Sequence, residues 1–194
     1  MKLSIHHRTI YRYKCPVPLQ PHRMILCPRG SKDIALLAGS LVCSPSAELD
    51  WAQDIFSNLI ATGTFTEPTS ELIITSELVV EQSAVAWPVF RIAPEAHSYP
   101  FAYSPDDLAD LGALRLPEHG DPEGRLEAWA RAFVLGALTD TLSLLKDLNS
   151  GILGLVEYRI RDEEGTQSPL ETLALASGSC RDIAALFIAA ARHL

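Results

Sequence analysis

Residues 177–194 read SGSCRDIAALFIAAARHL, a turn of small residues followed by one cysteine and an apolar segment. Ser179 and Asp182 have the spacing of a capping box, which marks the start of a helix. Cys180 then takes the first helical position. The apolar residues of this segment fall on one stripe, made of Ile183, Phe187, Ala190, Ala191 and Leu194. The pattern predicts a buried helix that presents Cys180 at its N-terminus.

A cysteine in this position has the chemistry of a nucleophile. The N-terminus of a helix favours the thiolate, which is the reactive form. Unpaired backbone N–H groups at the same place can hold an oxyanion, and Gly178 is expected to leave room for a substrate. The alternative is a capped, buried helix with an incidental cysteine. We expect Asp182 to cap the helix rather than act as an acid, because it points about 200° away from Cys180.

The rest of the chain divides into two halves, which together predict an α+β fold. Residues 1–90 contain short segments of period two, such as LSIHHRTIYRY, separated by breaks rich in proline or glycine. This spacing predicts an N-terminal antiparallel β-sandwich, with a hairpin turn at Ser57-Asn58 and a bulge at Gly39. Residues 91–194 are predicted to be mainly helical.

Three helix starts are written in the second half as a capping residue followed by proline. Ser104, Asp121 and Ser168 each stand at a predicted N-cap, with the proline at the first helical position. A further helix is predicted over residues 142–155, where leucine and isoleucine recur every three or four residues. Gly151 and Gly154 weaken that helix and leave room for another element to approach.

Charge and composition exclude several classes of function. The 194 residues carry 24 acidic and 16 basic side chains, a net charge of −8, without a basic cluster suited to phosphates, so we expect no nucleic-acid partner. We expect no membrane partner, because no run of about 18 apolar residues occurs. The charged N-terminus favours a cytoplasmic location.

The cysteines do not have metal-ligand spacing. Cys15, Cys27, Cys43 and Cys180 are far apart and lack a nearby histidine pair, so neither a metal site nor a cofactor is expected. We expect the first three to be small buried apolar residues.

The run GSCRDIAALFIAAARHL resembles the nucleophile segment of bacterial transglutaminase-like proteins, and VEYRIRDEEGTQSPLETLALASG, just before it, is similar to the same family. The segments TIYRYKCPVPLQPHRMILCPRG and WAQDIFSNLI resemble the β-rich domain that precedes the core in one bacterial branch. The resemblance implies that residues 91–194 are the helical N-terminal part of a papain-like core. It also implies a cysteine protease, amidase or transglutaminase in which Cys180 attacks a protein or peptide carboxamide.

In that family a histidine and then an aspartate follow the cysteine in the chain. Here the one histidine after Cys180 is His193, about 20 Å further along the same helix, too far to act as its base. His97 and His119 precede the cysteine. We therefore expect a fragment that is inactive alone, either cut from a longer protein or naturally short.

Two further expectations follow from the missing partners. The apolar stripe of the last helix would be exposed and would pair with a second copy of the chain, giving a homodimer. Tyr158, Thr166 and Gln167 lie in the loop from which an oxyanion donor could come.

The alternative functions are a non-catalytic binding or scaffold module of the same fold and, as a weaker possibility, a redox-sensing thiol.

Overall fold

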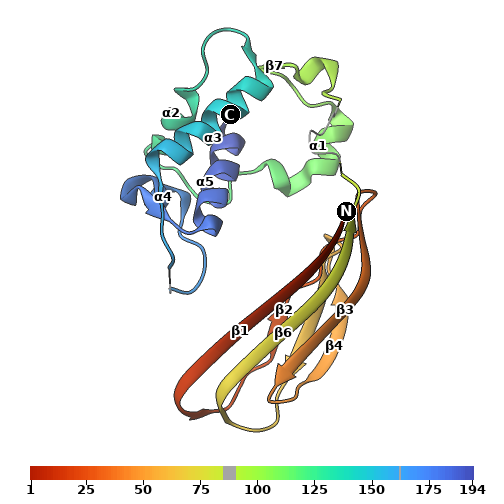
Figure 1. Ribbon diagram of the computed structural model, residues 1–194. Coiled ribbons are helices and arrows are strands. Elements are labelled where there is room, and N and C mark those ends of the chain that lie inside the picture. The colour runs from red at the N-terminus through yellow and green to blue at the C-terminus, as the bar shows by residue number, and fades with distance from the viewer. Residues whose placement is uncertain (85–90, 162) are drawn as a thin grey trace. The chain divides into compact units, whose positions relative to one another are not determined.

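The chain divides into two compact units, Met1–Val89 and Phe90–Leu194. The computed structural model describes residues 1–84, 91–161 and 163–194. The first unit consists of antiparallel sheets and the second of helices with short strand pairs (Figure 1). The α+β class predicted from the sequence is confirmed. Among the described residues, no helix is both long enough and apolar enough to cross a membrane.

The first unit, called the β unit here, contains two three-stranded sheets. One has the order β1-β6-β3, and the other has the order β2-β5-β4, with antiparallel neighbours in both. The strands of the first sheet are β1 (Lys2–Val17), β6 (Thr69–Gln82) and β3 (Ile34–Ser44). Those of the second are β2 (His22–Met24), β5 (Leu59–Thr64) and β4 (Glu48–Gln53).

One apolar core joins the two sheets of the β unit. Leu72 and Ile74 of β6 and Cys43 of β3 pack in one cluster with Met24 of β2 and Ala61 of β5. Since strand side chains alternate between faces, the buried residues of β6 fall at every second position, as period two predicts. The two sheets therefore share a single hydrophobic interior.

The cysteines of the β unit differ from one another in exposure. Cys43 is buried, and this burial raises the pKa of its thiol. Cys27 is half-buried and Cys15 is exposed. The expectation of three buried cysteines is therefore correct for Cys43 and wrong for Cys15, which lies near the end of the edge strand β1.

The hairpin turn is where the sequence predicted it, but the bulge is not. Asp54 closes the β4–β5 turn by accepting the backbone N–H of Asn58 at 2.8 Å, and Ser57 has a positive φ of 62°. The register of β3 shifts between Leu36 and Ala38, before Gly39. A Cβ at Gly39 would lie 3.1 Å from Cδ2 of Leu78, so this glycine serves close packing within the sheet.

The second unit, called the helical unit here, contains five α-helices in its described part. They are α1 (Pro105–Leu111), α2 (Arg125–Arg131), α3 (Thr141–Leu155), α4 (Pro169–Leu175) and α5 (Cys180–His193). Two strand pairs link the helices: β7 (Ser98–Tyr99) with β8 (Thr139–Asp140), antiparallel, and β9 (Glu157–Tyr158) with β10 (Ser177–Gly178), parallel. The 3-10 turns are η1 (Pro94–Ala96) and η2 (Gly112–Arg115).

Two of the three predicted helix starts are confirmed. Ser104 begins α1 and Ser168 begins α4, each with a reciprocal capping box that satisfies two orphan N–H groups. The third differs, because a turn precedes the helix and α2 begins at Arg125. The Asp121 carboxylate reaches across that turn and accepts the backbone N–H groups of Arg125 and Glu127, both at 2.9 Å.

The last helix is the centre of the helical core. α5 contacts α2, α3 and α4, and its Leu186 and Ala190 are buried with Leu148 and Ile152 of α3. Most of its predicted apolar stripe packs against this cluster, through Ile183, Phe187, Ala191 and Leu194. The expectation that the stripe lies exposed is wrong, because three helices of the same unit cover it. The homodimer predicted from that exposure stays a prediction.

The two glycines of α3 have different surroundings. A Cβ at Gly151 would overlap the ring of Phe133, whereas a Cβ at Gly154 would meet nothing within 4 Å. The close approach predicted for these glycines therefore occurs at Gly151 alone.

Candidate active site

Cys180 is the first residue of α5, and its side chain is exposed. The chain enters the helix from β10, which is held by β9: the Arg159 N–H donates to the Gly178 carbonyl at 2.9 Å. Ser179 follows as the buried, extended N-cap. The predicted helix start is confirmed, and the strand pair fixes the direction from which the chain reaches Cys180.

Asp182, in the first turn of α5, is the centre of a buried hydrogen-bond network. Its side chain is 0% exposed. Oδ2 accepts the backbone N–H of Ser179 at 2.7 Å and the Ser179 hydroxyl at 2.8 Å. Oδ1 accepts the backbone N–H of Gln167 at 2.7 Å, and Nη1 of Arg161 donates to both oxygens at 3.0 Å. The carboxylate thus ties the loop before α4 to the start of α5.

This network keeps Asp182 ionised. Burial by itself raises the pKa of the carboxyl group, because it disfavours the charged form. The hydrogen bonds from Ser179, Gln167 and Arg161 outweigh burial and hold the pKa of Asp182 well below its usual range. The predicted capping role is confirmed, and Asp182 also orders a loop that is distant in sequence.

Gly178 serves this network. We expected it to leave room for a substrate, but it is buried and packs on Asp182. A Cβ at Gly178 would lie 2.9 Å from Cβ of Asp182 and 3.5 Å from Cγ2 of Thr172. The absent side chain therefore makes room for the carboxylate, and the role at the substrate stays a prediction.

The loop before α4 supplies structural contacts to β10 and α4. Nε2 of Gln167 donates to the hydroxyl of Thr172 and to the carbonyl of Ser177, both at 3.0 Å, so its amide N–H is already used. Tyr158 and Thr166 are exposed. Sequence reasoning missed Arg161. The available signal was an aspartate inside an apolar helix, since a buried carboxylate needs a cationic partner.

A cleft of about 340 Å³ lies beside β10. The residues that line it come from the loop before α4, from the end of α4 and from β10: Arg159, Ile160, Arg161, Glu163, Gln167, Leu175, Ser177 and Gly178. Ile160 and Leu175 are large exposed apolar residues. The cleft therefore combines apolar side chains with the polar wall formed by Arg161 and Gln167.

The histidine that follows Cys180 in the chain lies away from the thiol. His193 is the last residue of α5, at the opposite end of the helix from Cys180, and its Nε2 is buried there. His193 therefore cannot act as the base of Cys180. The carbonyl of His97 accepts the backbone N–H of Thr141 at the start of α3.

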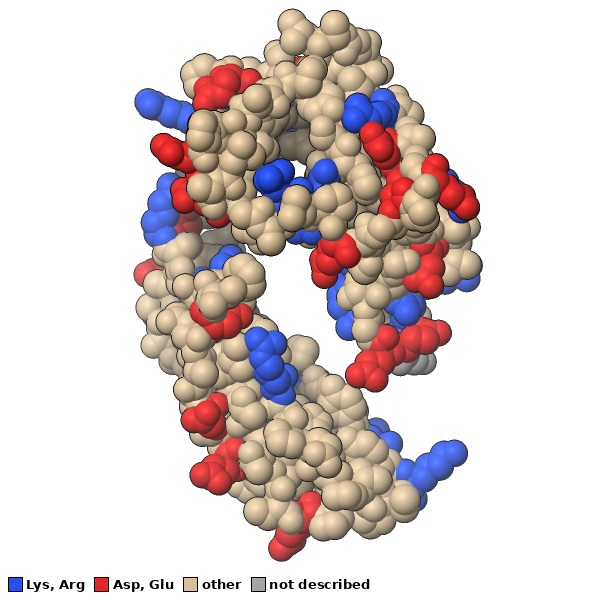
Figure 2. Space-filling view, turned by 180° about the vertical axis from the view of Figure 1, so that it is seen from behind, with Lys and Arg blue, Asp and Glu red and all other residues tan. Residues whose placement is uncertain are grey.

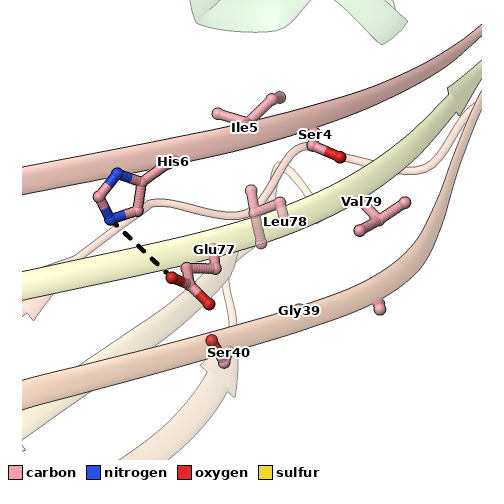
Figure 3. A pocket seen from close by; sticks show the side chains of 9 residues that line it. Ser4, Ile5, His6, Gly39, Ser40, Glu77, Leu78 and Val79 are labelled. Atoms are coloured by element: carbon pink, nitrogen blue, oxygen red, sulfur yellow. Dashed lines mark ion pairs between the residues drawn. The ribbon is translucent and has the colours of Figure 1, made fainter.

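A second hollow lies on the β unit (Figure 3). It has a volume of about 450 Å³ and is lined by neighbouring segments of β1, β6 and β3. His6 Nε2 faces Glu77 Oε1 at 3.9 Å, and the two side chains are 60% and 67% exposed. Because both side chains are exposed, solvent screens the attraction between His6 and Glu77. The two residues therefore do not form a positioned catalytic dyad. Ile5 and Leu78 give this hollow an apolar part.

The surface charge is mixed on the face shown in Figure 2, where basic and acidic side chains are interspersed. The ion pairs agree with this picture: Arg12 with Glu71, Arg131 with Glu127 and Arg159 with Glu157. In the described part of the chain, no three of its His, Cys, Asp and Glu residues are grouped so as to hold a metal ion.

The fold and the exposed thiol together define an α+β chain with a cysteine at the start of a core helix. The same fold occurs in the crystal structure of a proposed cysteine protease from Cytophaga hutchinsonii. That chain is 19% identical, the TM-score is 0.75, and the match covers 100% of this chain and 64% of the other. This likeness shows the fold.

The sequence comparison concerns mainly the β unit. Residues 3–81 match the bacterial transglutaminase-like N-terminal region, and this match supports the bacterial transglutaminase-like family predicted from the sequence. Uncharacterized proteins of Mycobacterium tuberculosis and Mycobacterium bovis are 28% identical over 195 residues. The match covers 98% of this chain and 62% of those relatives, so the chain spans less than two thirds of their length.

Proposed function

We propose that this chain carries the nucleophile of a transglutaminase-like thiol enzyme that acts on protein or peptide carboxamides through a thioester on Cys180. The observation that carries the proposal is the exposed Cys180 at the first position of α5, on a helix start locked by the buried Asp182. A helix N-terminus favours a thiolate, and a rigid start keeps it in place.

The reaction proposed is acyl transfer. Sγ of Cys180 attacks the carbonyl carbon, a C–S bond forms, and the C–N bond breaks as ammonia or an amine leaves with a proton from the base. Water or a second amine then attacks the thioester and releases the thiol. No acceptor takes the backbone N–H of Cys180 among the described residues, so this group is available to an oxyanion.

The base and its orienting carboxylate are proposed to lie outside these 194 residues. The family resemblance implies a histidine and an aspartate after the cysteine, whereas His193, the one histidine after Cys180 in these 194 residues, lies at the opposite end of α5. The mycobacterial relatives are longer than this chain, which covers 62% of their length. We accordingly expect the 194-residue chain alone to react with electrophiles at Cys180 but not to turn over a substrate.

The test compares the 194-residue chain with a protein spanning the length of the relatives. Both are incubated with a glutamine-containing peptide, and ammonia release and an acyl adduct on Cys180 are measured. The longer protein should release ammonia and lose this activity as Cys180→Ala. Cys15→Ala is the matched control, because Cys15 is also exposed but lies in β1, and it should remain active. Turnover by the Cys180→Ala variant would contradict the proposal.

The competing function is a non-catalytic binding module, and the hollow on the β unit is the observation that favours it. That function requires ligand binding to be independent of Cys180 and sensitive to the hollow. Ile5→Asp should then abolish binding while Cys180→Ala leaves it intact. Acyl transfer predicts the opposite pattern for turnover.

A further inference from the structure

We propose that Arg161 is a positioning residue for the Cys180 nucleophile, acting through Asp182. The inference deepens the proposed function and rests on it. Arg161 lies 19 residues before Cys180 in the chain, in the loop that precedes α4, and nothing in its local sequence links it to the thiol. The structure links the two through one carboxylate.

The mechanical link is short and fully hydrogen-bonded. Nη1 of Arg161 donates to both oxygens of Asp182 at 3.0 Å, and the Arg161 side chain is only 17% exposed. Oδ2 of Asp182 in turn holds both the backbone N–H and the hydroxyl of Ser179, the residue directly before Cys180. Each partner restricts the next, so the rotation of the Ser179–Cys180 peptide depends on where Arg161 holds the carboxylate.

The same contact has an electrostatic effect. Asp182 lies two residues after Cys180, within one turn of the helix, and its side chain is 0% exposed. An unpaired anion at this depth would oppose formation of a thiolate at the helix start. Arg161 neutralises it, so the favourable field of the helix N-terminus is retained at Cys180.

The other charged groups around this pair are exposed to solvent or hydrogen-bonded elsewhere. Glu163 Oε2 is 3.5 Å from Nε of Arg161 and is exposed to solvent. α4 carries Glu171, whose pKa is lowered chiefly by its hydrogen bonds to Ser168 and further by the charge of Arg161. β10 carries no charge, and Arg181 on α5 is exposed beside Cys180.

The remaining helices do not alter this balance. α2 and α3 meet α5 through apolar side chains, among them Leu126, Leu148 and Ile152. Asp182 and Arg161 therefore form the buried ion pair whose disruption should change the reactivity of the Cys180 thiol.

The experiment measures alkylation of the 194-residue protein by iodoacetamide, with Cys180 and Cys15 quantified separately by peptide mass spectrometry from pH 5 to 10. Arg161→Met should slow Cys180 at pH 7 by about five- to tenfold and move its rate profile to higher pH, because the carboxylate loses its partner. Arg161→Met with Asp182→Asn removes the unpaired charge and should restore the profile. Cys15 should not change in any variant.

Two further variants separate positioning from folding. Arg161→Lys keeps the positive charge but removes the planar guanidinium, whose Nη1 contacts Asp182 and whose Nε faces Glu163, so it should lower thermal stability while leaving the pH profile near that of the wild type. Arg159→Met is the matched control: it removes an exposed arginine two positions away, whose side chain pairs with Glu157, and should leave Cys180 unchanged. If Arg161→Met does not fold, Arg161→Gln replaces it in the same comparison.

The outcomes distinguish this inference from the proposed function. If every variant loses stability and none shifts the Cys180 profile, Arg161 is structural and the positioning role is wrong. If wild-type Cys180 reacts no faster than Cys15, the proposed nucleophile role of Cys180 is wrong, whatever Arg161 does. A fast Cys180 whose profile shifts in Arg161→Met and returns in the double variant supports both.

Discussion

Both units have ion pairs on the surface, but the helical unit also has a buried one. In the β unit the ion pairs lie on the surface, as between Arg12 and Glu71, whose side chains are 74% and 42% exposed, and the core is formed by side chains such as Leu72 and Ile74. In the helical unit a carboxylate, Asp182, is fully buried and paired with Arg161. Burying a charge is costly in free energy. The helical unit nevertheless buries the Asp182 carboxylate, two residues after the exposed Cys180, so this pair serves more than the packing of the core.

The largest effect should follow from breaking the buried pair. Arg161→Met leaves the Asp182 carboxylate without its cation, and the helical unit should lose about 3–5 kcal/mol in free energy of unfolding. Hydrogen exchange resolved by peptide would measure the loss in α5 and show β6 unchanged. The double variant with Asp182→Asn should recover part of the loss. If α5 exchanged hydrogen at the same rate in the wild type and in Arg161→Met, the buried pair would not stabilise the helical unit, and the contrast with the exposed pairs of the β unit would be lost.

A smaller loss should come from crowding the same carboxylate. Gly178→Ala brings a Cβ to 2.9 Å from Cβ of Asp182 and should cost about 1–3 kcal/mol. Gly154→Ala in α3 is the control, since that Cβ meets nothing within 4 Å, and it should stabilise the helix by up to about 1 kcal/mol. Urea denaturation measures both. If Gly154→Ala destabilised the protein, open space around a glycine would not predict the sign of the change in free energy of unfolding.

Acid should act on the helical unit through Asp182. Its folded-state pKa is depressed, so its contribution to stability is present above the unfolded pKa near ~3.9 and is lost as pH falls toward the folded pKa. Between pH 4 and 3 this one group should cost about 1 kcal/mol, and Asp182→Asn should flatten that slope. An unchanged slope in Asp182→Asn would mean that another carboxyl group dominates the acid response.

The smallest effect should come from the surface of the β unit. Arg12→Met breaks the 2.9 Å contact with Glu71, but both side chains are largely open to solvent. Screening limits the loss to about 0–1 kcal/mol, and 0.5 M salt should erase most of it. A loss as large as that of Arg161→Met would show that the buried pair of the helical unit is worth no more than this exposed pair.

Local signals predicted much of this molecule, and contacts across the chain were what sequence reasoning missed. Period two identified the strands, and the caps at Ser104, Ser168 and Ser179 identified three helix starts, because both depend on neighbours in sequence. Asp121 was misplaced because an additional turn separates it from the helix that it caps. Arg161 was missed because its partner lies 21 residues away, a pairing that no local pattern encodes.

The packing of Gly178 shows the same limit. Its place two residues before Cys180 predicts a role at the substrate, which stays a prediction, but gives no sign that it packs against the Asp182 side chain. The stripe of α5 was correctly identified as apolar, but its cover, formed by α2, α3 and α4, required the tertiary arrangement.

The alkylation rate of Cys180 tests most directly whether this thiol is an activated nucleophile. Cys180 and Cys15 are both exposed, so they can be compared in one sample of the same protein. At pH 7, iodoacetamide should modify Cys180 at least about tenfold faster than Cys15, because Cys180 alone lies at the N-terminus of a helix. Equal rates, or a slower Cys180, would contradict the account.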